Sequence, residues 1–313
     1  MTIRPFEPSD LEAVAALLEK TLVADRIPSG LFQRKVLLDP NFDSNGALVA
    51  VEDGEVAGFV LGIVRKLPIE DQIPDFDRSW ITLIAVDPSH QGNGIGMELL
   101  RCLEPYLKEK RSTSVWVSPY APNYFTPGVD VNAYPGAVGF FKKNGFEEVY
   151  RPLSMDASLP GLKTPEWVSE KEQQLAKAGV SVEQFNPGHI LPLLEFVRAE
   201  FAGDWQRYVR ETMSRVSSDR DFPNSLWIAA EKDRVLGFAQ HEGERFGPFG
   251  VAVKERGRGI GAVLLFRCLY AMRDKGLHNA WFMWTDDKAA KLYQQAGFVE
   301  SRRYVVMRKA LVK

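Results

Sequence analysis

Cysteine is scarce in this sequence, and the two that occur, Cys102 and Cys268, form no C-x-x-C pair. This spacing supports neither a disulfide framework nor a zinc site, and we expect no bound metal. Long apolar runs are also missing, since none approaches the ~18 residues of a membrane-spanning helix. The first residues contain no apolar core of the kind found in signal peptides. A reduced, cytoplasmic protein without a membrane partner is therefore expected.

An excess of charge of either sign is absent too. The 39 lysines and arginines nearly balance 41 aspartates and glutamates, so the basic surface that nucleic-acid binding requires is not indicated. A hydrophobic content of 45% is ordinary for a globular protein. The 313 residues suffice for about two domains, each of roughly 100–200 residues. Composition leaves the oligomeric state open.

Glycine, by contrast, is concentrated after a short apolar strand that ends near Val253. Residues Arg256–Gly261 read RGRGIG, and an apolar pattern with helical spacing follows from Val263. A strand, a glycine turn and a helix N-terminus form an anion cradle, because unpaired backbone N–H groups and the positive end of the helix dipole converge there. The arginines add charge that binds phosphate oxygens. We therefore predict a phosphate-binding loop.

Three kinds of phosphate-binding loop have a glycine-rich pattern comparable with this segment. A Walker loop needs Gly-Lys-Ser/Thr, which does not occur here. A dinucleotide fingerprint needs glycine or alanine three positions after its second glycine, where only Ala262 is available. The pattern Arg-x-x-Gly-x-Gly between strand and helix resembles the pyrophosphate loop of the GCN5-related N-acetyltransferase (GNAT) superfamily, which binds acetyl-CoA. Downstream, Leu292–Phe298 resembles the helix end Leu-Tyr-x-x-x-Gly-Phe of that family.

The chain repeats this unit. A second loop, Gln91–Gly96 (QGNGIG), follows an apolar strand, and Phe141–Phe146 echoes Tyr293–Phe298. We place an N-terminal unit at residues 1–155, a linker at 156–178 and a C-terminal unit at 179–313. The resemblance implies an α/β fold with a mixed (α+β) sheet, present as two tandem acyl-CoA N-acyltransferase (GNAT) folds. In that family the fourth and fifth strands diverge and hold the pantetheine arm between them.

The resemblance implies acetyl-CoA as co-substrate, held by the glycine loops and the strands before them. The expected binding residues are Val251, Val253, Arg256, Gly257, Arg258, Gly259, Ile260 and Gly261, and in the first repeat Ile84, Val86, Gln91, Gly92, Gly94 and Gly96. The loop of the first repeat, Gln91–Gly96, has an alternative interpretation as a relic turn that stabilises the fold and binds no ligand.

Transfer of an acetyl group to an amine needs a base for the amine and a proton donor for the departing thiolate. By resemblance, Tyr293 is the general acid. Asp287 is the first candidate for the base, since Asp286 suits a helix N-cap. The N-terminal unit has Phe141 at the position of Tyr293, and phenylalanine cannot donate a proton. Tyr120, Tyr124 and Tyr134 are the alternative candidates for a proton donor in that unit.

Residues 119–135 of the N-terminal unit form an aromatic, proline-rich insertion where an acceptor would enter. Tyr124, Asp130 and Asn132 are candidate acceptor ligands, and a rigid Ω-loop is the alternative. An acidic loop at 66–78, with Glu70 and Asp71, is a weaker candidate for attracting an amine.

The predicted function is an acetyl-CoA-dependent N-acetyltransferase acting by direct transfer on the primary amine of a small polar molecule. Chemistry is assigned to the C-terminal unit, and an amino sugar is the narrower match by resemblance. Alternatives are a relative of the synthase that acetylates a cysteinyl amino-sugar thiol (mycothiol-synthase-like), an acyl-CoA-binding regulatory protein without chemistry, and a protein lysine acetyltransferase.

Overall fold

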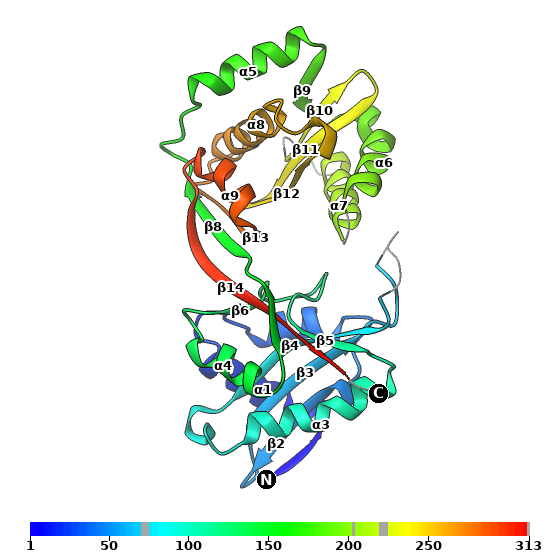
Figure 1. Cartoon of the computed structure of the whole chain (residues 1–313), viewed down its shortest axis with the longest axis vertical. Coiled ribbons are helices and arrows are strands. Elements are labelled where there is room, and N and C mark those ends of the chain that lie inside the picture. The colour runs from blue at the N-terminus through cyan, green and yellow to red at the C-terminus, as the bar shows by residue number, and fades with distance from the viewer. Residues whose placement is uncertain (70–74, 202–203, 219–224, 312–313) are drawn as a thin grey trace. The chain divides into compact units, whose positions relative to one another are not determined.

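A computed structural model describes residues 1–69, 75–201, 204–218 and 225–311, and the chain divides into two compact units. The N-terminal unit holds the chain up to Pro152 together with residues from Arg303 onward, and the C-terminal unit holds Leu153–Arg302. Each unit contains a mixed sheet with helices, so the predicted α/β architecture with a repeated unit is confirmed (Figure 1). Within the described ranges, no helix is both long and apolar enough to cross a bilayer.

The N-terminal sheet has the order β1-β2-β3-β4-β5-β14, and only the β4–β5 pair is parallel. Its strands are β1 (Thr2–Pro5), β2 (Ala47–Glu52), β3 (Glu55–Val64), β4 (Arg78–Val86), β5 (Ser114–Val117) and β14 (Val299–Ala310), with β6 (Val129–Asp130) and β7 (Glu147–Tyr150) also paired to β14. Its helices are α1 (Leu11–Thr21), α2 (Ser29–Phe32), α3 (Ile95–Glu109) and α4 (Pro135–Lys143).

Helices cover both faces of this sheet. Neighbouring residues of a strand point to opposite faces, and on β2 Leu48 packs in a core with α3 while Val49 packs in a core with α1. Leu99 and Leu103 recur four residues apart along α3, which forms the apolar stripe that faces the sheet.

The C-terminal unit repeats this plan with the sheet order β8-β13-β12-β11-β10-β9, in which only β12–β13 is parallel. Its strands are β8 (Leu153–Ser158), β9 (Val180–Gln184), β10 (Leu226–Glu231), β11 (Arg234–Glu242), β12 (Arg245–Val251) and β13 (Asn279–Thr285). Its helices are α5 (Glu166–Lys177), α6 (Ile190–Glu200), α7 (Trp205–Ser218), α8 (Ile260–Asp274) and α9 (Asp287–Gln294).

The two units differ from the predicted ranges 1–155, 156–178 and 179–313 at both boundaries. The predicted linker contains structured parts of the C-terminal unit, because β8 pairs with β13 and α5 packs against α8 (Figure 1). The end of β14 belongs to the N-terminal unit, where Met307–Ala310 pairs with β5. Hydrophobic periodicity identifies a strand but not its hydrogen-bonding partner, so the sequence pattern did not reveal this exchange of strands.

Candidate active site

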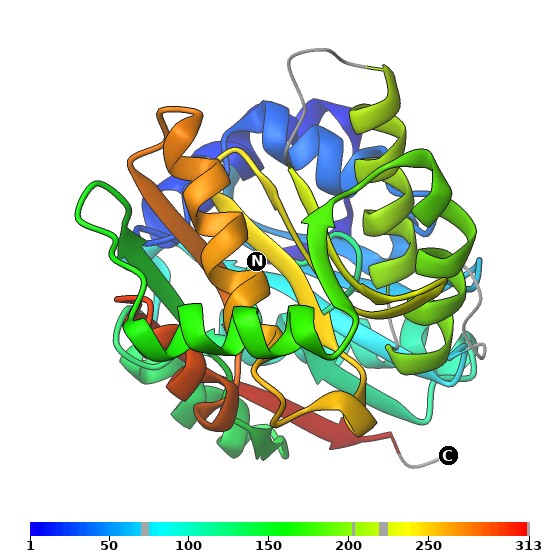
Figure 2. The ribbon, with the colours of Figure 1, turned by 90° about the horizontal axis from the view of Figure 1, so that it is seen from above.

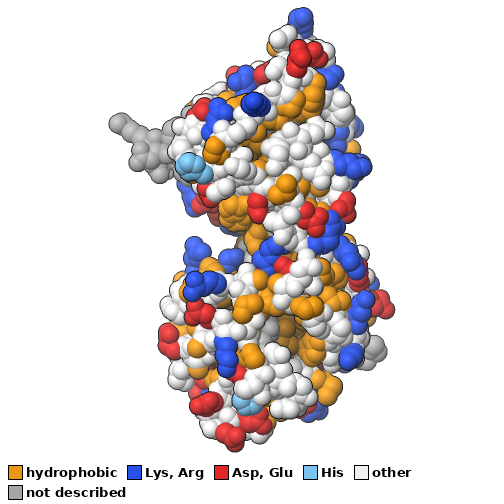
Figure 3. Space-filling model, turned by 90° about the vertical axis from the view of Figure 1, so that its left-hand side faces the viewer, with side chains coloured by type: hydrophobic (Ala, Val, Ile, Leu, Met, Phe, Trp, Pro, Cys, Tyr) orange, Lys and Arg blue, Asp and Glu red, His pale blue; other side chains and the backbone are white. Residues whose placement is uncertain are grey.

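The N-terminal unit has a cavity where β4 and β5 separate. Their parallel pairing runs from Arg78↔Ser114 to Ile81↔Val117, and β4 continues beyond it to Val86. A cavity of about 700 Å³ lies along this stretch, within the range typical of small-ligand sites. On the face of the N-terminal unit drawn in Figure 3, hydrophobic side chains surround a hollow. Separation of the strands therefore creates a ligand-sized space with strand backbone at its edge.

The glycine loop of the N-terminal unit opens onto this cavity. Gly92 and Gly94 have φ values of 82° and 84°, a region that favours glycine, and Gly94 is the N-cap of α3. A Cβ atom built on either glycine would meet no described atom within 4 Å, so the backbone is uncovered at these two positions. The cavity wall includes all six cofactor-binding residues predicted for this unit: Ile84, Val86, Gln91, Gly92, Gly94 and Gly96.

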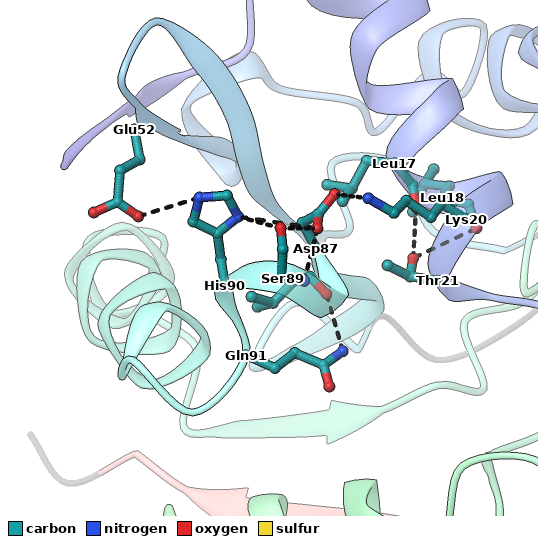
Figure 4. Close-up of polar contacts among 10 residues, drawn as sticks. Leu17, Leu18, Lys20, Thr21, Glu52, Asp87, Ser89, His90 and Gln91 are labelled. Carbon is teal, nitrogen blue, oxygen red and sulfur yellow. Dashed lines mark hydrogen bonds and ion pairs between the residues drawn. The ribbon is translucent and has the colours of Figure 1, made fainter.

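Hydrogen bonds hold the turn that leads from β4 into this loop (Figure 4). The Asp87 carboxylate accepts hydrogen bonds from Lys20 Nζ at 2.7 Å and from the backbone N–H of Ser89 at 2.9 Å. The bond from Lys20, followed by those from Ser89, holds the pKa of the Asp87 carboxyl well below its usual range. Gln91 Nε2 donates to the Val86 carbonyl at 3.1 Å. The loop is therefore anchored to both α1 and the end of β4.

The cavity reaches both faces of the sheet. On one side it is lined by Phe140 and Asn144 of the α4 region, and on the other by Leu22, Asp25 and Ile27 beyond the end of α1. Since α1 and α3 cover opposite faces of the sheet, the gap between β4 and β5 connects the part of the cavity on the α1 face with the part on the α3 face. A donor bound at the glycine loop can thus meet an acceptor that enters from the α1 side.

The insertion contributes to the cavity, but not through the predicted acceptor ligands. Asp130 is 3% exposed, and its carboxylate accepts hydrogen bonds from the backbone N–H groups of Asn132 and Ala133. Tyr124 accepts a 2.7 Å hydrogen bond at its carbonyl from Lys35 Nζ. Phe125, Thr126 and Tyr134 form the cavity wall instead.

Of the three tyrosines considered as proton donors for this unit, Tyr134 lines the cavity, and its hydroxyl donates to Asp25 Oδ2 at 2.8 Å. Tyr120 is 2% exposed and donates to Asp39 instead. In the acidic loop, Asp75 pairs with Arg65 at 2.7 Å, whereas Glu70 and Asp71 lie outside the described residues.

In the C-terminal unit, aromatic side chains occupy the corresponding gap. β12 and β13 share the single parallel pair Arg245↔Trp281 before they separate. When the two repeats are aligned on their glycine loops, Phe246 and Phe249 of β12 stand where β4 has Ile81 and Ile84. In the parallel strand pairs, Phe282 of β13 stands where β5 has Val117. Their ring centroids lie 6.1, 5.9 and 4.4 Å from that of Tyr293. The three rings therefore pack around Tyr293.

Tyr293, predicted as the general acid, is 9% exposed, and burial raises the pKa of its hydroxyl. Asp287, predicted as the base, is exposed in the first turn of α9, more than a turn and a half from Tyr293. Asp286 acts as the N-cap and accepts from the Ala289 N–H at 2.7 Å, as predicted for that residue. The structure thus gives Tyr293 a packing role in the aromatic cluster, and its catalytic role stays a prediction.

The predicted cofactor residues of this unit converge at the start of α8, where α5 covers part of the loop. A Cβ atom built on Gly259 would lie 2.9 Å from the Lys171 stem, and α5 crosses this end of α8 (Figure 2). An ion pair between Glu172 and Arg267 holds the two helices together at 2.6 Å. The cofactor-binding residues predicted for the C-terminal unit are Val251, Val253, Arg256, Gly257, Arg258, Gly259, Ile260 and Gly261.

Two polar contacts further engage this loop. The Val253 N–H donates to the Glu200 carboxylate at 3.0 Å, and the Arg258 guanidinium pairs with Glu255. Sequence reasoning missed both the aromatic cluster and the cover by α5. The aromatic cluster could have been found by comparing the two repeats, because the aliphatic Ile84 of the first repeat corresponds to the aromatic Phe249 of the second.

Comparison with known proteins identifies the family to which both units belong. Residues 14–146 match the model described as the acetyltransferase (GNAT) family, and residues 223–300 match an acetyltransferase (GNAT) domain. The chain is 25% identical over 311 residues to mycothiol acetyltransferase of Thermomonospora curvata, covering 95% of this chain and 91% of that protein.

Two solved structures share the fold over the whole chain. One is a GCN5-related glucosamine N-acetyltransferase region of a fungal multi-domain enzyme (TM-score 0.78, 19% identity, 98% of this chain and 38% of that one). The other is a GCN5-related N-acetyltransferase from Sphaerobacter thermophilus (TM-score 0.68, 20% identity, 100% of this chain and 96% of that one). With both repeats matched by family models, the chain belongs to the GNAT acetyltransferase family as a member with two GNAT domains in tandem.

Proposed function

We propose that this chain is an acetyl-CoA-dependent N-acetyltransferase that binds acetyl-CoA in the cavity of its N-terminal unit and transfers the acetyl group directly to a primary amine. The observation that carries this proposal is the contrast between the two glycine loops. A Cβ atom built on Gly94 meets nothing within 4 Å and its loop opens onto a 700 Å³ cavity, whereas a Cβ atom built on Gly259 would lie 2.9 Å from the Lys171 stem, although at the neighbouring Gly257 it meets nothing.

The residues present suit such a cofactor. The uncovered N–H groups at the start of α3 and the dipole of that helix favour a pyrophosphate. Beyond Ile81, the β4 edge offers backbone groups to the amides of a pantetheine arm. Acetyl-CoA supplies the thioester that activates the acetyl group. Thr82 lines this gap, and its Oγ1 is buried without a hydrogen-bond partner in the described part of the chain, so its hydroxyl is a donor for charge that develops there.

Matched loop variants test the location of the cofactor site. Gln91 and Arg256 occupy equivalent positions, and each side chain donates to the carbonyl at the end of its strand. Gln91→Glu adds negative charge beside the proposed phosphate site, so we expect acetyl-CoA affinity in calorimetric titration to fall at least about tenfold, or about 1.4 kcal/mol. Arg256→Glu should leave the affinity unchanged. The reverse order would overturn the assignment to the N-terminal unit.

Tyr293→Phe tests which unit performs the chemistry. If the N-terminal unit does, the variant should retain turnover within about twofold, because the phenyl ring preserves the packing of the aromatic cluster. General acid–base groups contribute about 10²–10⁴-fold. A loss of that size in steady-state turnover, accompanied by a similar loss for Asp287→Asn, would support the prediction that Tyr293 and Asp287 act in the C-terminal unit.

A second candidate function rests on the relative named mycothiol acetyltransferase, which matches 95% of this chain. On that reading the acceptor is the amine of a cysteinyl amino-sugar thiol. A free amino sugar is another candidate acceptor, because one structure with the same fold is described as a glucosamine N-acetyltransferase region. Tight acetyl-CoA binding without turnover on any amine would instead support a binding protein that lacks chemistry.

A further inference from the structure

We infer that the Thr82 hydroxyl relays a proton from the attacking amine to the departing sulfur when the N-terminal unit transfers an acetyl group. The inference rests on the proposed function, since it assigns one step of that reaction to a side chain of the same cavity. The tyrosine that resemblance implies as the proton donor is replaced in this unit by Phe141, which has no proton to give. Another group of the cavity must therefore protonate the sulfur.

Thr82 lies where the gap between β4 and β5 begins. The parallel pairing of the two strands ends at Ile81↔Val117, one residue before Thr82. In the pairing of β4 with β3, Thr82 has no partner and is the extra residue of a β-bulge. From Thr82 to Val86, beside the glycine loop, the strand extends about 13 Å, at ~3.3 Å per residue. An extended pantetheine arm spans such a stretch, so a donor with its pyrophosphate at the loop brings its thioester to Thr82.

Thr82 differs from the other hydroxyl groups of the cavity in the use of its hydrogen. The other described hydroxyl residues of the cavity wall donate to protein acceptors: Thr21 to the Leu17 carbonyl at 2.7 Å, Thr126 to the Gly128 carbonyl at 2.9 Å, Ser118 to the Thr126 carbonyl, and Tyr134 to Asp25 at 2.8 Å. Thr82 Oγ1 is buried and has no hydrogen-bond partner among the residues that the structure describes. Because an unmade hydrogen bond of a buried hydroxyl is costly, a ligand that bonds to Thr82 is favoured.

The Thr82 hydroxyl can turn toward a thioester in the gap. Thr82 as a whole is partly exposed and lines the cavity, although its Oγ1 is buried. Rotation about the Cα–Cβ bond moves the hydroxyl and the methyl group between staggered positions, and this rotation breaks no hydrogen bond to a described residue. A hydroxyl donates one hydrogen and also accepts, which are the two properties that a proton relay needs.

The two repeats carry a hydroxyl at different positions of the gap. When they are aligned on their glycine loops, Gly247 of the second repeat stands where the first has Thr82. The second repeat instead has Tyr293, at the position of Phe141. The N-terminal unit therefore retains a hydroxyl for proton transfer at the gap although it lacks the tyrosine.

The proposed step balances without a further acid or base. The acceptor enters as neutral R–NH2, and its nitrogen lone pair forms the C–N bond with the acetyl carbonyl carbon while the carbonyl oxygen takes up the negative charge. The nitrogen then gives one proton to Thr82 Oγ1, and the hydroxyl proton of Thr82 passes to sulfur. The carbonyl re-forms, and the C–S bond breaks with its electron pair on sulfur. The products are the N-acetyl amide and the thiol of CoA.

The first test compares Thr82→Val with Thr82→Ser in acetyl-CoA calorimetry and in acetylation of D-glucosamine and hydroxylamine by the full chain. Valine keeps the shape without the hydroxyl, so kcat should fall about 100-fold or more, as for the loss of a general acid–base group. Acetyl-CoA affinity should stay constant, and serine should restore most of the turnover. Ser79→Ala removes a hydroxyl from the paired part of β4 and should change neither quantity.

A proton inventory tests the relay in the unsubstituted protein. Two protons move together in the relay, one onto Thr82 and one onto sulfur. The single-turnover rate should therefore fall along a bowed curve as D2O replaces H2O. A straight line, or no change in rate, would overturn the relay.

Absence of acetyl-CoA binding by the wild-type chain would overturn the proposed function itself. Intact binding without acetylation of either amine, full turnover by folded Thr82→Val, or equal losses in Thr82→Val and Thr82→Ser would overturn only the relay. Thr82→Val should melt at or above the wild-type temperature, because it removes a buried hydroxyl without a partner among the described residues. If it melts below that temperature, Thr82→Ala decides, since it removes the hydroxyl and adds no new group.

Discussion

Ile84→Trp is expected to abolish detectable acetyl-CoA binding to this protein, a loss of at least about 100-fold, or ~2.7 kcal/mol. Ile84 lies on β4 beyond the last pair with β5 and lines the cavity. An indole ring at this position would occupy the gap between the strands, in the way that Phe249 occupies the equivalent gap of the C-terminal unit. Calorimetric titration with acetyl-CoA measures the effect directly.

Ile84→Val is the matched control, because it keeps an aliphatic side chain and should retain the affinity within about threefold. Thermal unfolding should show that Ile84→Trp remains folded, since the added ring enters existing space. Undiminished acetyl-CoA binding by folded Ile84→Trp would mean that the cofactor does not pass between β4 and β5.

Phe282→Ala is expected to have the largest effect on stability, lowering the free energy of unfolding of the C-terminal unit by about 3–5 kcal/mol. Phe282 is 7% exposed, and its ring centroid lies 4.4 Å from that of Tyr293 and 5.3 Å from that of Phe298. Removal of the ring leaves a cavity in the aromatic cluster and forfeits its contacts. Urea denaturation of the full chain, followed through the transition of this unit, measures the change.

Trp281→Ala provides the comparison, because Trp281 is the neighbouring residue on β13 and is 36% exposed. Its loss should cost less than that of Phe282. Acetyl-CoA affinity should remain unchanged in Phe282→Ala, since Lys171 still covers Gly259 and the proposed site lies in the other unit. A destabilisation below about 1 kcal/mol would contradict the packing role of the cluster, and a gain of a second acetyl-CoA site would indicate that the rings alone close the C-terminal gap.

The two repeats share one fold and differ at a few positions around the gap between their parallel strands. Both have separated parallel strands and a glycine N-cap at the helix that follows, Gly94 and Gly259. The difference lies in side chains at the gap, where Ile84 corresponds to Phe249, and in the cover supplied by α5. Fold likeness alone therefore does not determine which unit binds the cofactor.

The sequence by itself determined the local parts of this protein. The glycine loops, the strands before them and the repeat of the whole unit were predictable, because each is a short pattern with its own backbone requirement, such as the positive φ of Gly94. The family resemblance of Leu292–Phe298 was equally local, and matches to two GNAT domains bear it out.

The tertiary structure alone decided which side chains lie against each loop. Lys171 lies far from Gly259 in the chain, as does Phe246 from Phe282, and no periodicity reports contacts between such segments. The same holds for Asp25 and Tyr134, whose hydrogen bond joins the end of α1 to the start of α4. Whether a glycine loop receives a ligand or a neighbouring side chain depends on how distant segments pack, because burial is a property of the folded chain and not of the motif.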